Sequence, residues 1–277
     1  DTGVAHIIEH SVLSGSKRYP VRDPFVCMLK SSMATFINAM TYPDKTVYPV
    51  SSRNDADFLN LVDVYMDAVL HPLSIENRMA LDQEGWHYEF DENGRLVMNG
   101  VVYSEMKGVF SNPDSIAFWE TMKLLFPDCC YSKESGGDPA HIPDLTFEAY
   151  KAFHSRFYHP SNSRIFLDGK VDIDATLARL DSFLKDYGRS DVRAEIPLQR
   201  PVSKSATVKY EVSDDGKDKF ILVDGWVIGK FDDREGRLAF AVLSEALAGS
   251  NEAPLKKALL DRGLCEDVEL GAEGVQQ

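Results

Sequence analysis

Residues 4–13 read Val4-Ala5-His6-Ile7-Ile8-Glu9-His10-Ser11-Val12-Leu13, and this stretch decides how the rest of the chain is interpreted. On an α-helix, residues three and four apart share a face, so His6, Glu9 and His10 are expected to project together. Their apolar neighbours are typical of a buried helix that carries its polar groups into a site. Two imidazoles at this spacing can hold one zinc ion, and a carboxylate beside them can take a proton from water.

The pattern HxxEH, with the acid directly before the second histidine, is the inverted form of a signature found in zinc proteases. A pair of hydrogen-bonded core histidines is the alternative interpretation of the same residues. The chain has only seven histidines in 277 residues, so a chance match to HxxEH is uncommon. Residues further along the chain must decide between a metal site and a core histidine pair.

Composition narrows the classes of function. The 44% hydrophobic and 27% charged residues are those of a globular protein with one large domain or two ordinary ones. The net charge of −14 argues against a nucleic-acid partner, because such a partner's phosphates must be neutralised by Lys and Arg. A solubilising acidic surface explains this charge, and attraction of basic peptides is the alternative. No apolar run approaches the roughly 18 residues of a membrane span, so no membrane partner is expected.

The four cysteines, Cys27, Cys129, Cys130 and Cys265, fit neither a disulfide scaffold nor a Cys-x-x-Cys metal site. Buried thiols in a reducing compartment are therefore expected, which means the mitochondrial or plastid matrix in a eukaryote and the cytoplasm in a bacterium. The N-terminus resembles neither a signal peptide nor a transit peptide, although a longer precursor could carry either.

Periodicity predicts an α+β fold in which antiparallel-rich mixed sheets pack against helices. Strands at residues 35–41 and 45–50 form one predicted hairpin, and residues 86–90 and 95–98 form another around an Asn-Gly turn. Further strands are predicted at 164–167, 206–212 and 219–227. Helices are predicted at residues 24–29, 58–70, 75–83, 101–110, 146–158, 175–184, 235–248 and 254–260, with one more that ends at residue 125.

This order of elements predicts that the chain is divided into three parts. We expect a first α+β domain over residues 1–190, which would carry the metal site. A segment with two prolines among mixed charges, 191–204, is interpreted as a linker. Residues 205–277 repeat the strand-then-helix order and are interpreted as part of a second α+β domain.

A hydrolytic zinc site takes three protein ligands and one water, so a third His, Asp or Glu is expected from a distant segment. His71 is interpreted as a charge at a helix C-terminus, and His154 and His159 as structural, because neither has a partner at ligand spacing. Glu105 is the best candidate, because it lies in the predicted helix 101–110 among small and apolar residues, where a carboxylate needs a cation. A Glu105–Lys pair would satisfy this need equally well.

Several segments occur together in a specific order. They are residues 6–10 continuing through 14–25, then 35–41, 83–86, 100–108, 135–139, 158–162 and 249–259. In this combination the chain resembles the pitrilysin/insulinase family of zinc peptidases, in particular its presequence-protease and falcilysin branch, over essentially its whole length.

The resemblance implies a pitrilysin-like domain in which His6, His10 and Glu105 bind one zinc ion per chain. It implies that Glu9 is the general base that deprotonates the attacking water. Glu84 either steadies a zinc ligand from behind or is a carboxylate on the surface of a hairpin.

The predicted strand at 35–41 matches the edge strand to which this family adds an extended peptide. Main-chain hydrogen bonds would hold the peptide, so selectivity would depend little on its sequence. A plain hairpin strand is the alternative, and it is compatible with this role. The substrate-binding residues expected on this basis are Thr35, Phe36, Asn38 and Ala39.

The function implied is that of a zinc-dependent endopeptidase that degrades unfolded peptides, such as cleaved targeting sequences. A catalytically silent subunit and a peptidase that processes larger precursors are the alternatives. The presence of both histidines and both glutamates favours an active member, because silent relatives lose some of these residues. Members consist of two similar halves that close around the peptide, and this chain resembles only the first half, without its first strands. We therefore expect the second half to be a missing partner, and this piece alone to hydrolyse peptides poorly.

Overall fold

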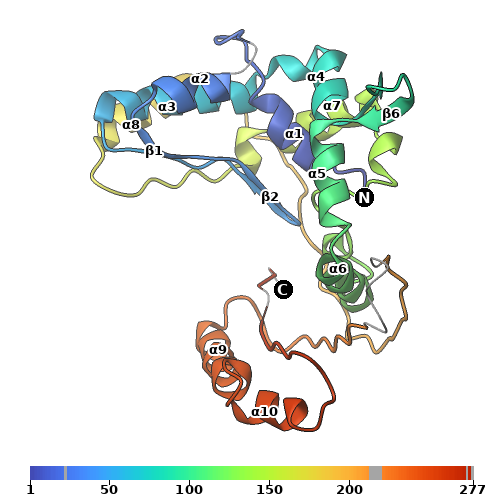
Figure 1. Cartoon of the computed structure of the whole chain (residues 1–277). Coiled ribbons are helices and arrows are strands. Elements are labelled where there is room, and N and C mark those ends of the chain that lie inside the picture. The colour runs from blue at the N-terminus through green and yellow to red at the C-terminus, as the bar shows by residue number, and fades with distance from the viewer. Residues whose placement is uncertain (22–23, 212–219, 273, 276–277) are drawn as a thin grey trace.

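Helix α1 (Val4–Val12) lies in the main hydrophobic core of this computed structural model, which describes all residues except 22–23, 212–219, 273 and 276–277 (Figure 1). Ile7, Ile8 and Val12 are fully buried in this core. Burial of each such side chain contributes roughly 1.5–3 kcal/mol. The helix begins after Gly3, whose φ of 64° lies in the left-handed region that glycine tolerates best. The core therefore holds the histidine-bearing helix in place along its length.

Four further helices contribute buried side chains to the same core. They are α3 (Asp55–Leu70), α4 (Arg78–Glu84), α5 (Val101–Val109) and α7 (Phe147–Phe157). Asn54, Asn77 and Thr146 precede three of them, and each side chain accepts a hydrogen bond from the first-turn backbone. Such caps are worth about 1 kcal/mol each, which explains why these helices begin where they do. The remaining α-helices are α2 (Pro24–Ser31), α6 (Pro113–Leu125), α8 (Ile173–Leu184), α9 (Arg234–Ala248) and α10 (Pro254–Leu260).

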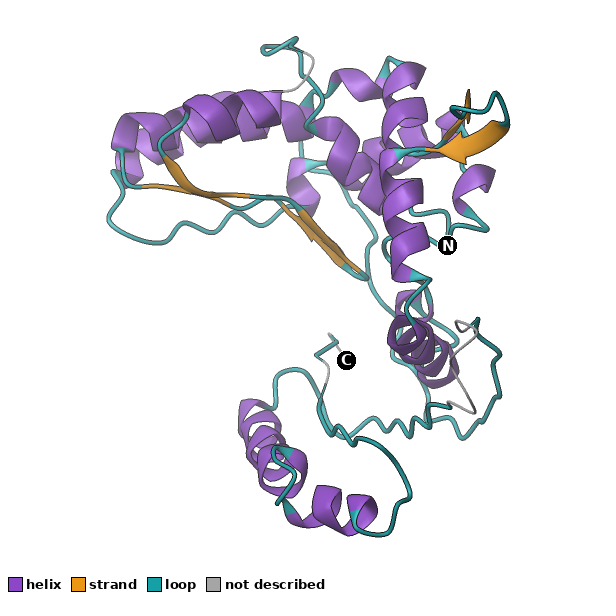
Figure 2. Cartoon of the chain, in the orientation of Figure 1, coloured by secondary structure: helices purple, strands orange, loops and turns teal. Residues whose placement is uncertain are grey.

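The described strands form three antiparallel pairs, coloured orange in Figure 2. The predicted hairpin over 35–50 is confirmed, but it is interrupted at Asn38-Ala39, opposite Tyr48-Pro49. Proline has no N–H to donate, so the ladder loses a hydrogen bond at this point, although Asn38 N–H still donates to the Pro49 carbonyl over 3.2 Å. The hairpin over 86–98 is confirmed as well. The strands are β1 (Ala34–Ile37), β2 (Met40–Tyr42), β3 (Lys45–Val47), β4 (Val50–Ser52), β5 (His87–Phe90) and β6 (Leu96–Asn99).

The α+β class is confirmed, although every strand pair in the described part of the chain is antiparallel rather than mixed. The strands predicted at 164–167, 206–211 and 220–227 are wrong: these residues are described and adopt no regular structure, while 212 and 219 lie outside the described residues. Alternating apolar residues favour an extended backbone, but a strand also needs a neighbour to pair with. The division into 1–190, 191–204 and 205–277 stays a prediction.

The cysteines depart from expectation in one respect. All four are free, but Cys27 is exposed and the others are half-buried, so the prediction of buried thiols is wrong. On α2 it is Phe25 and Met28 that pack against the main core, and Cys27 lies between them on the outer face. None of the described helices has both the length and the apolar character that crossing a bilayer requires.

Candidate metal centre

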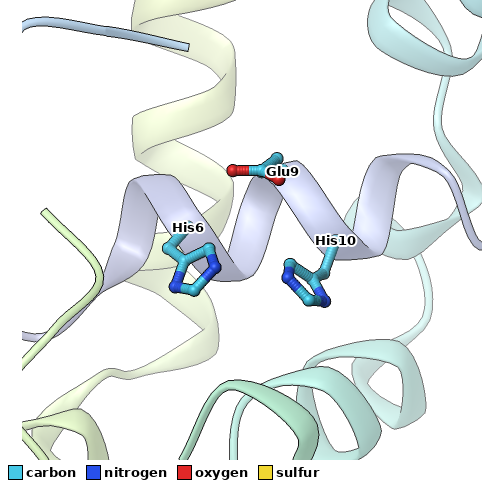
Figure 3. Close-up of side chains that lie close together, drawn as sticks. All are labelled: His6, Glu9 and His10. Carbon is cyan, nitrogen blue, oxygen red and sulfur yellow. The ribbon is translucent and has the colours of Figure 1, made fainter. Parts of the chain in front are cut away.

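His6 and His10 occupy successive turns of α1, and their rings lie close together. The ring centroids are 4.8 Å apart with an interplanar angle of 81°. Figure 3 shows both imidazoles extending from the same side of the helix and the Glu9 carboxylate from another side. Ligand atoms of these three residues all lie within 4.8 Å of one another, and Glu9 is only 6% exposed. The helix therefore presents two nitrogen donors and, beside them, a buried carboxylate.

Glu105 on α5 faces the same two histidines. Its Oε2 atom lies 3.8 Å from Nε2 of His6 and 3.8 Å from Nε2 of His10. Within the described residues, these imidazoles and no lysine are the ion-pair partners of Glu105. The apolar surroundings expected for this carboxylate are wrong, because its side chain is 50% exposed. The buried face of α5 is formed by Val102 and Met106 instead.

Each imidazole is held through its other ring nitrogen. Nδ1 of His6 donates to the carbonyl oxygen of Gly136 over 3.2 Å; a carbonyl can only accept, so the proton lies on Nδ1. Nδ1 of His10 lies 3.5 Å from Oε2 of Glu84, at the end of α4. Glu84 is only 8% exposed, so of its two interpretations the surface carboxylate is wrong. Both rings thus leave Nε2 free on the side of Glu105, the arrangement that partners of metal-bound histidines impose.

The charge of His10 is shaped by the carboxylates around it. Burial lowers its pKa, whereas Glu84, Glu9 and Glu105 raise it, and the raising effects prevail. Three carboxylates around one imidazole make a strongly negative environment. Such an environment favours a cation, either a proton on the ring or a metal ion between the rings.

The donor set formed by His6, His10 and Glu105 fits zinc. Zinc takes imidazole nitrogen and carboxylate oxygen at about 2.0–2.2 Å, which places ligand atoms of a tetrahedral site about 3.4 Å apart. The two Nε2–Oε2 distances of 3.8 Å are close to this spacing. Three protein ligands would leave one position for water, as in hydrolytic zinc sites. Glu9 is a second carboxylate within reach of the two imidazoles, since ligand atoms of His6, Glu9 and His10 all lie within 4.8 Å of one another.

Two tyrosines, which the sequence did not point to, lie near Glu9. The hydroxyl groups of Tyr48 and Tyr158 are 2.8 Å apart. Burial above all, with contributions from the partner tyrosine and Glu9, raises the pKa of Tyr48 well above its usual value. Burial likewise raises the pKa of Tyr158 to about 12. Both hydroxyls therefore stay protonated beside Glu9 at neutral pH.

The substrate-binding candidates divide into two pairs. Thr35 and Phe36 are exposed on β1, whereas Asn38 and Ala39 lie half-buried in the interruption between β1 and β2. The carbonyl of Asn38 accepts a hydrogen bond from Tyr65 over 3.2 Å, and Ala39 packs against the main core. Of the described strands only β4 pairs with β1, so the other edge of β1 pairs with none of them.

The histidines predicted to be structural have other partners. His71 ends α3 and lies 3.2 Å from Asp67. Nε2 of His154 donates to the carbonyl of Val69 over 3.0 Å, and His159 caps a short 3₁₀ helix. The predicted position of His71 at a helix C-terminus is confirmed, and these contacts support the structural interpretation of His154 and His159.

Comparison with known proteins gives the family context. Residues 1–107 match the family described as "Insulinase (Peptidase family M16)", and residues 144–275 match "Peptidase M16 inactive domain". The chain is 47% identical over 95% of its length to "Protein HypA" of Clostridium perfringens. It is 44% identical over 96% of its length to "Presequence protease 1, chloroplastic/mitochondrial" of Arabidopsis thaliana. It spans 28% and 25% of these two relatives, about a quarter of their length.

A solved structure supports the fold independently of sequence. A protease from Helicobacter pylori is similar with a TM-score of 0.63, over 99% of this chain and 62% of that chain. The sequence identity is 17%, so this likeness bears on the fold alone.

Proposed function

Because the chain belongs to the M16 insulinase/pitrilysin family and is presequence protease-like, we propose that it is the metal-binding part of a zinc endopeptidase acting on unstructured peptides. One observation carries this proposal: Nε2 of His6 and Nε2 of His10 both lie near Oε2 of Glu105, with Glu9 alongside. The part of the chain that matches the inactive domain, 144–275, follows all four residues. The match to that domain therefore does not argue against catalysis at this site.

The residues divide the chemistry between them. His6, His10 and Glu105 would hold the metal, and the contacts of Gly136 and Glu84 keep the two Nε2 atoms available. A bound zinc ion supplies Lewis acidity, which activates water near neutral pH and polarises a peptide carbonyl. Glu9 accepts the proton that the attacking water loses, and its burial in the described structure excludes competing solvent.

An extended peptide is the substrate that the fold favours. The edge of β1 that pairs with none of the described strands offers main-chain donors and acceptors, and only a chain without folded structure can add along such an edge. Thr35 and Phe36 would flank the bound peptide, and Asn38 and Ala39 would lie nearer the metal. The Arabidopsis relative is named a presequence protease, so cleaved targeting peptides are the class that we propose. The second half of the peptidase would complete the chamber around them.

The test uses the full-length protein, its zinc content and an unstructured fluorogenic peptide. Wild type and Glu9→Gln are expected to bind one zinc per chain, while turnover by the variant falls about 10²–10⁴-fold because the general base is lost. Glu89→Gln, an exposed carboxylate on β5, is the matched control and should retain turnover. Undiminished cleavage by Glu9→Gln would contradict the mechanism. Zinc retained by the Glu105→Ala, His10→Ala double variant would contradict the ligand set.

A further inference from the structure

The loop 134–138 lies between the two helices that carry the proposed zinc ligands. On one side, the Gly136 carbonyl accepts the hydrogen bond from His6 of α1. On the other side, a Cβ added to Gly136 would overlap the sulfur of Met106 on α5. A Cβ on Gly137, whose φ is +99°, would lie 2.7 Å from Cα of Gly3. Gly137 can approach the backbone at the start of α1 this closely only because it is glycine, whereas at Gly136 the neighbour is the end of the flexible Met106 side chain.

Glu134 fixes the loop from within. Its Oε1 accepts the backbone N–H of Gly136 over 2.9 Å, and its main-chain carbonyl accepts the N–H of Gly137 over 3.1 Å. The first bond holds the peptide unit before Gly136, and the second holds the unit that carries the Gly136 carbonyl. Both soft torsions of Gly136 are therefore restrained, and the carbonyl stays aimed at His6.

Placing a carboxyl group here costs free energy. Glu134 is only 8% exposed, and its Oε2 is buried with no hydrogen-bond partner among the described residues. Burial, the largest effect, raises the pKa of Glu134 to about 7, even though Gly136 and Ser135 act in the opposite direction. An apolar residue would fill the same space without this cost, so packing alone does not explain a carboxyl group at this position. Its hydrogen bond to the Gly136 N–H does.

We propose that Glu134 is a positioning residue for His6, which it holds in the Nδ1–H tautomer through the Gly136 peptide. This inference rests on the proposed zinc function. Glycine samples more backbone conformations than any other residue. Without the Glu134 Oε1 acceptor, only the main-chain bond from Gly137 N–H to the Glu134 carbonyl restrains the Gly136 peptide, so the Gly136 carbonyl is held less firmly toward His6. The imidazole is then free to carry its proton on Nε2, and a protonated Nε2 cannot bind a metal.

The experiment compares Glu134→Met with Glu134→Gln in the full-length protein. Methionine keeps the length and the packing but removes the acceptor, whereas glutamine keeps an oxygen for the Gly136 N–H. Zinc affinity is measured by competition with a chromophoric chelator, and circular dichroism on the same samples gives the folded fraction. Zinc binding is expected to weaken about tenfold in Glu134→Met and to stay within about twofold of wild type in Glu134→Gln. Asp144→Asn, an exposed carboxylate just after this loop, is the control and should match wild type.

Each alternative result has a distinct meaning. Unchanged affinity in Glu134→Met overturns the inference, and so does equal loss in the Met and Gln variants. If Glu134→Met does not fold, the ¹⁵N chemical shifts of His6 in metal-free wild type decide. The Nδ1–H tautomer supports the inference, and the Nε2–H tautomer overturns it. A wild type that binds no zinc refutes the proposed function instead, and the His6 tautomer compared between metal-free wild type and metal-free Glu134→Met still tests the role of Glu134.

Discussion

Replacing Glu84 by alanine removes the carboxylate behind His10, and we expect zinc affinity to fall roughly ten- to hundredfold. The Glu84 side chain is only 10% exposed, and its Oε2 lies 3.5 Å from Nδ1 of His10. Two full charges at this distance attract by roughly 5 kcal/mol at an effective dielectric constant of about 20. A metal-bound imidazole carries only part of a charge, and burial of the carboxylate offsets part of the gain. A net loss of about 1.4–2.8 kcal/mol, which equals the stated range, is therefore expected.

The assay is zinc competition against a chelator at pH 7.5, with folding monitored on the same samples. Glu84→Gln keeps an acceptor for Nδ1 of His10 but loses the charge, so its affinity should lie between wild type and Glu84→Ala. Glu89→Ala is the matched control, because Glu89 is also 3.5 Å from a histidine, His87, but is 45% exposed and lies on a hairpin. That variant should bind zinc as wild type does.

A Glu84→Ala protein that is folded and binds zinc within twofold of wild type would refute the reasoning. Equal losses in Glu84→Ala and Glu89→Ala would also refute it, since they would trace the effect to net charge rather than to support of His10. Alanine leaves the His10 N–H without this partner, and a lost partner in a buried site costs about 1–3 kcal/mol of folding free energy. For this reason, the zinc affinity of each variant is calculated for the folded fraction of the sample only.

The remaining predictions concern stability. Tyr150→Phe removes a fully buried hydroxyl 2.5 Å from Ser11 Oγ, so urea unfolding should show a loss of about 1–3 kcal/mol, and an equally stable variant would contradict this. Gly137→Ala should cost about 1–3 kcal/mol, because φ is +99°, and should lower the Tm, whereas Gly188→Ala, in open space, should not. The pKa of Glu134 is raised from 4.5 to about 7, so the folded state holds a proton that the unfolded state has lost between these values. Its stabilising contribution is complete below pH 4.5 and is lost as pH rises through about 7, by at most about 3 kcal/mol. Denaturant unfolding at pH 5 and 8 should show a smaller pH dependence in Glu134→Gln, and parallel curves would contradict this.

The predicted fold was most accurate where a local rule applies. The helices after residue 100 begin and end within a few residues of their predicted bounds, because the 3.6-residue period and the capping residues act within one or two turns. The strands at 164–167, 206–211 and 220–227 failed because pairing depends on a second segment, which the local pattern does not contain. The 35–50 hairpin combines a local feature with a non-local one. Its turn was predictable from the sequence, whereas its division into two strand pairs beside Pro49 is seen only in the folded structure.

For the candidate metal site too, local spacing was predictable from the sequence, whereas contacts between distant segments were not. The spacing of His6, Glu9 and His10 predicted that all three project together, because helical geometry relates residues three and four apart. The two imidazoles do share one side of the helix, whereas the Glu9 carboxylate extends from another side. Glu105 was selected by a burial argument that the structure does not support, and by family resemblance. Its position 3.8 Å from both rings depends on how α5 packs against α1.

Only the tertiary structure revealed what holds the imidazoles. His6 meets Gly136 130 positions away, and His10 meets Glu84 on α4. No periodicity links residues so far apart, since their contact depends on how whole elements pack rather than on any local preference. The sequence by itself identified His6, Glu9 and His10 as a candidate metal-binding group. The packing of α4, α5 and the 134–138 loop around α1 decided which ring nitrogens face Glu105, because each Nδ1 is held by a partner that only the folded chain brings near.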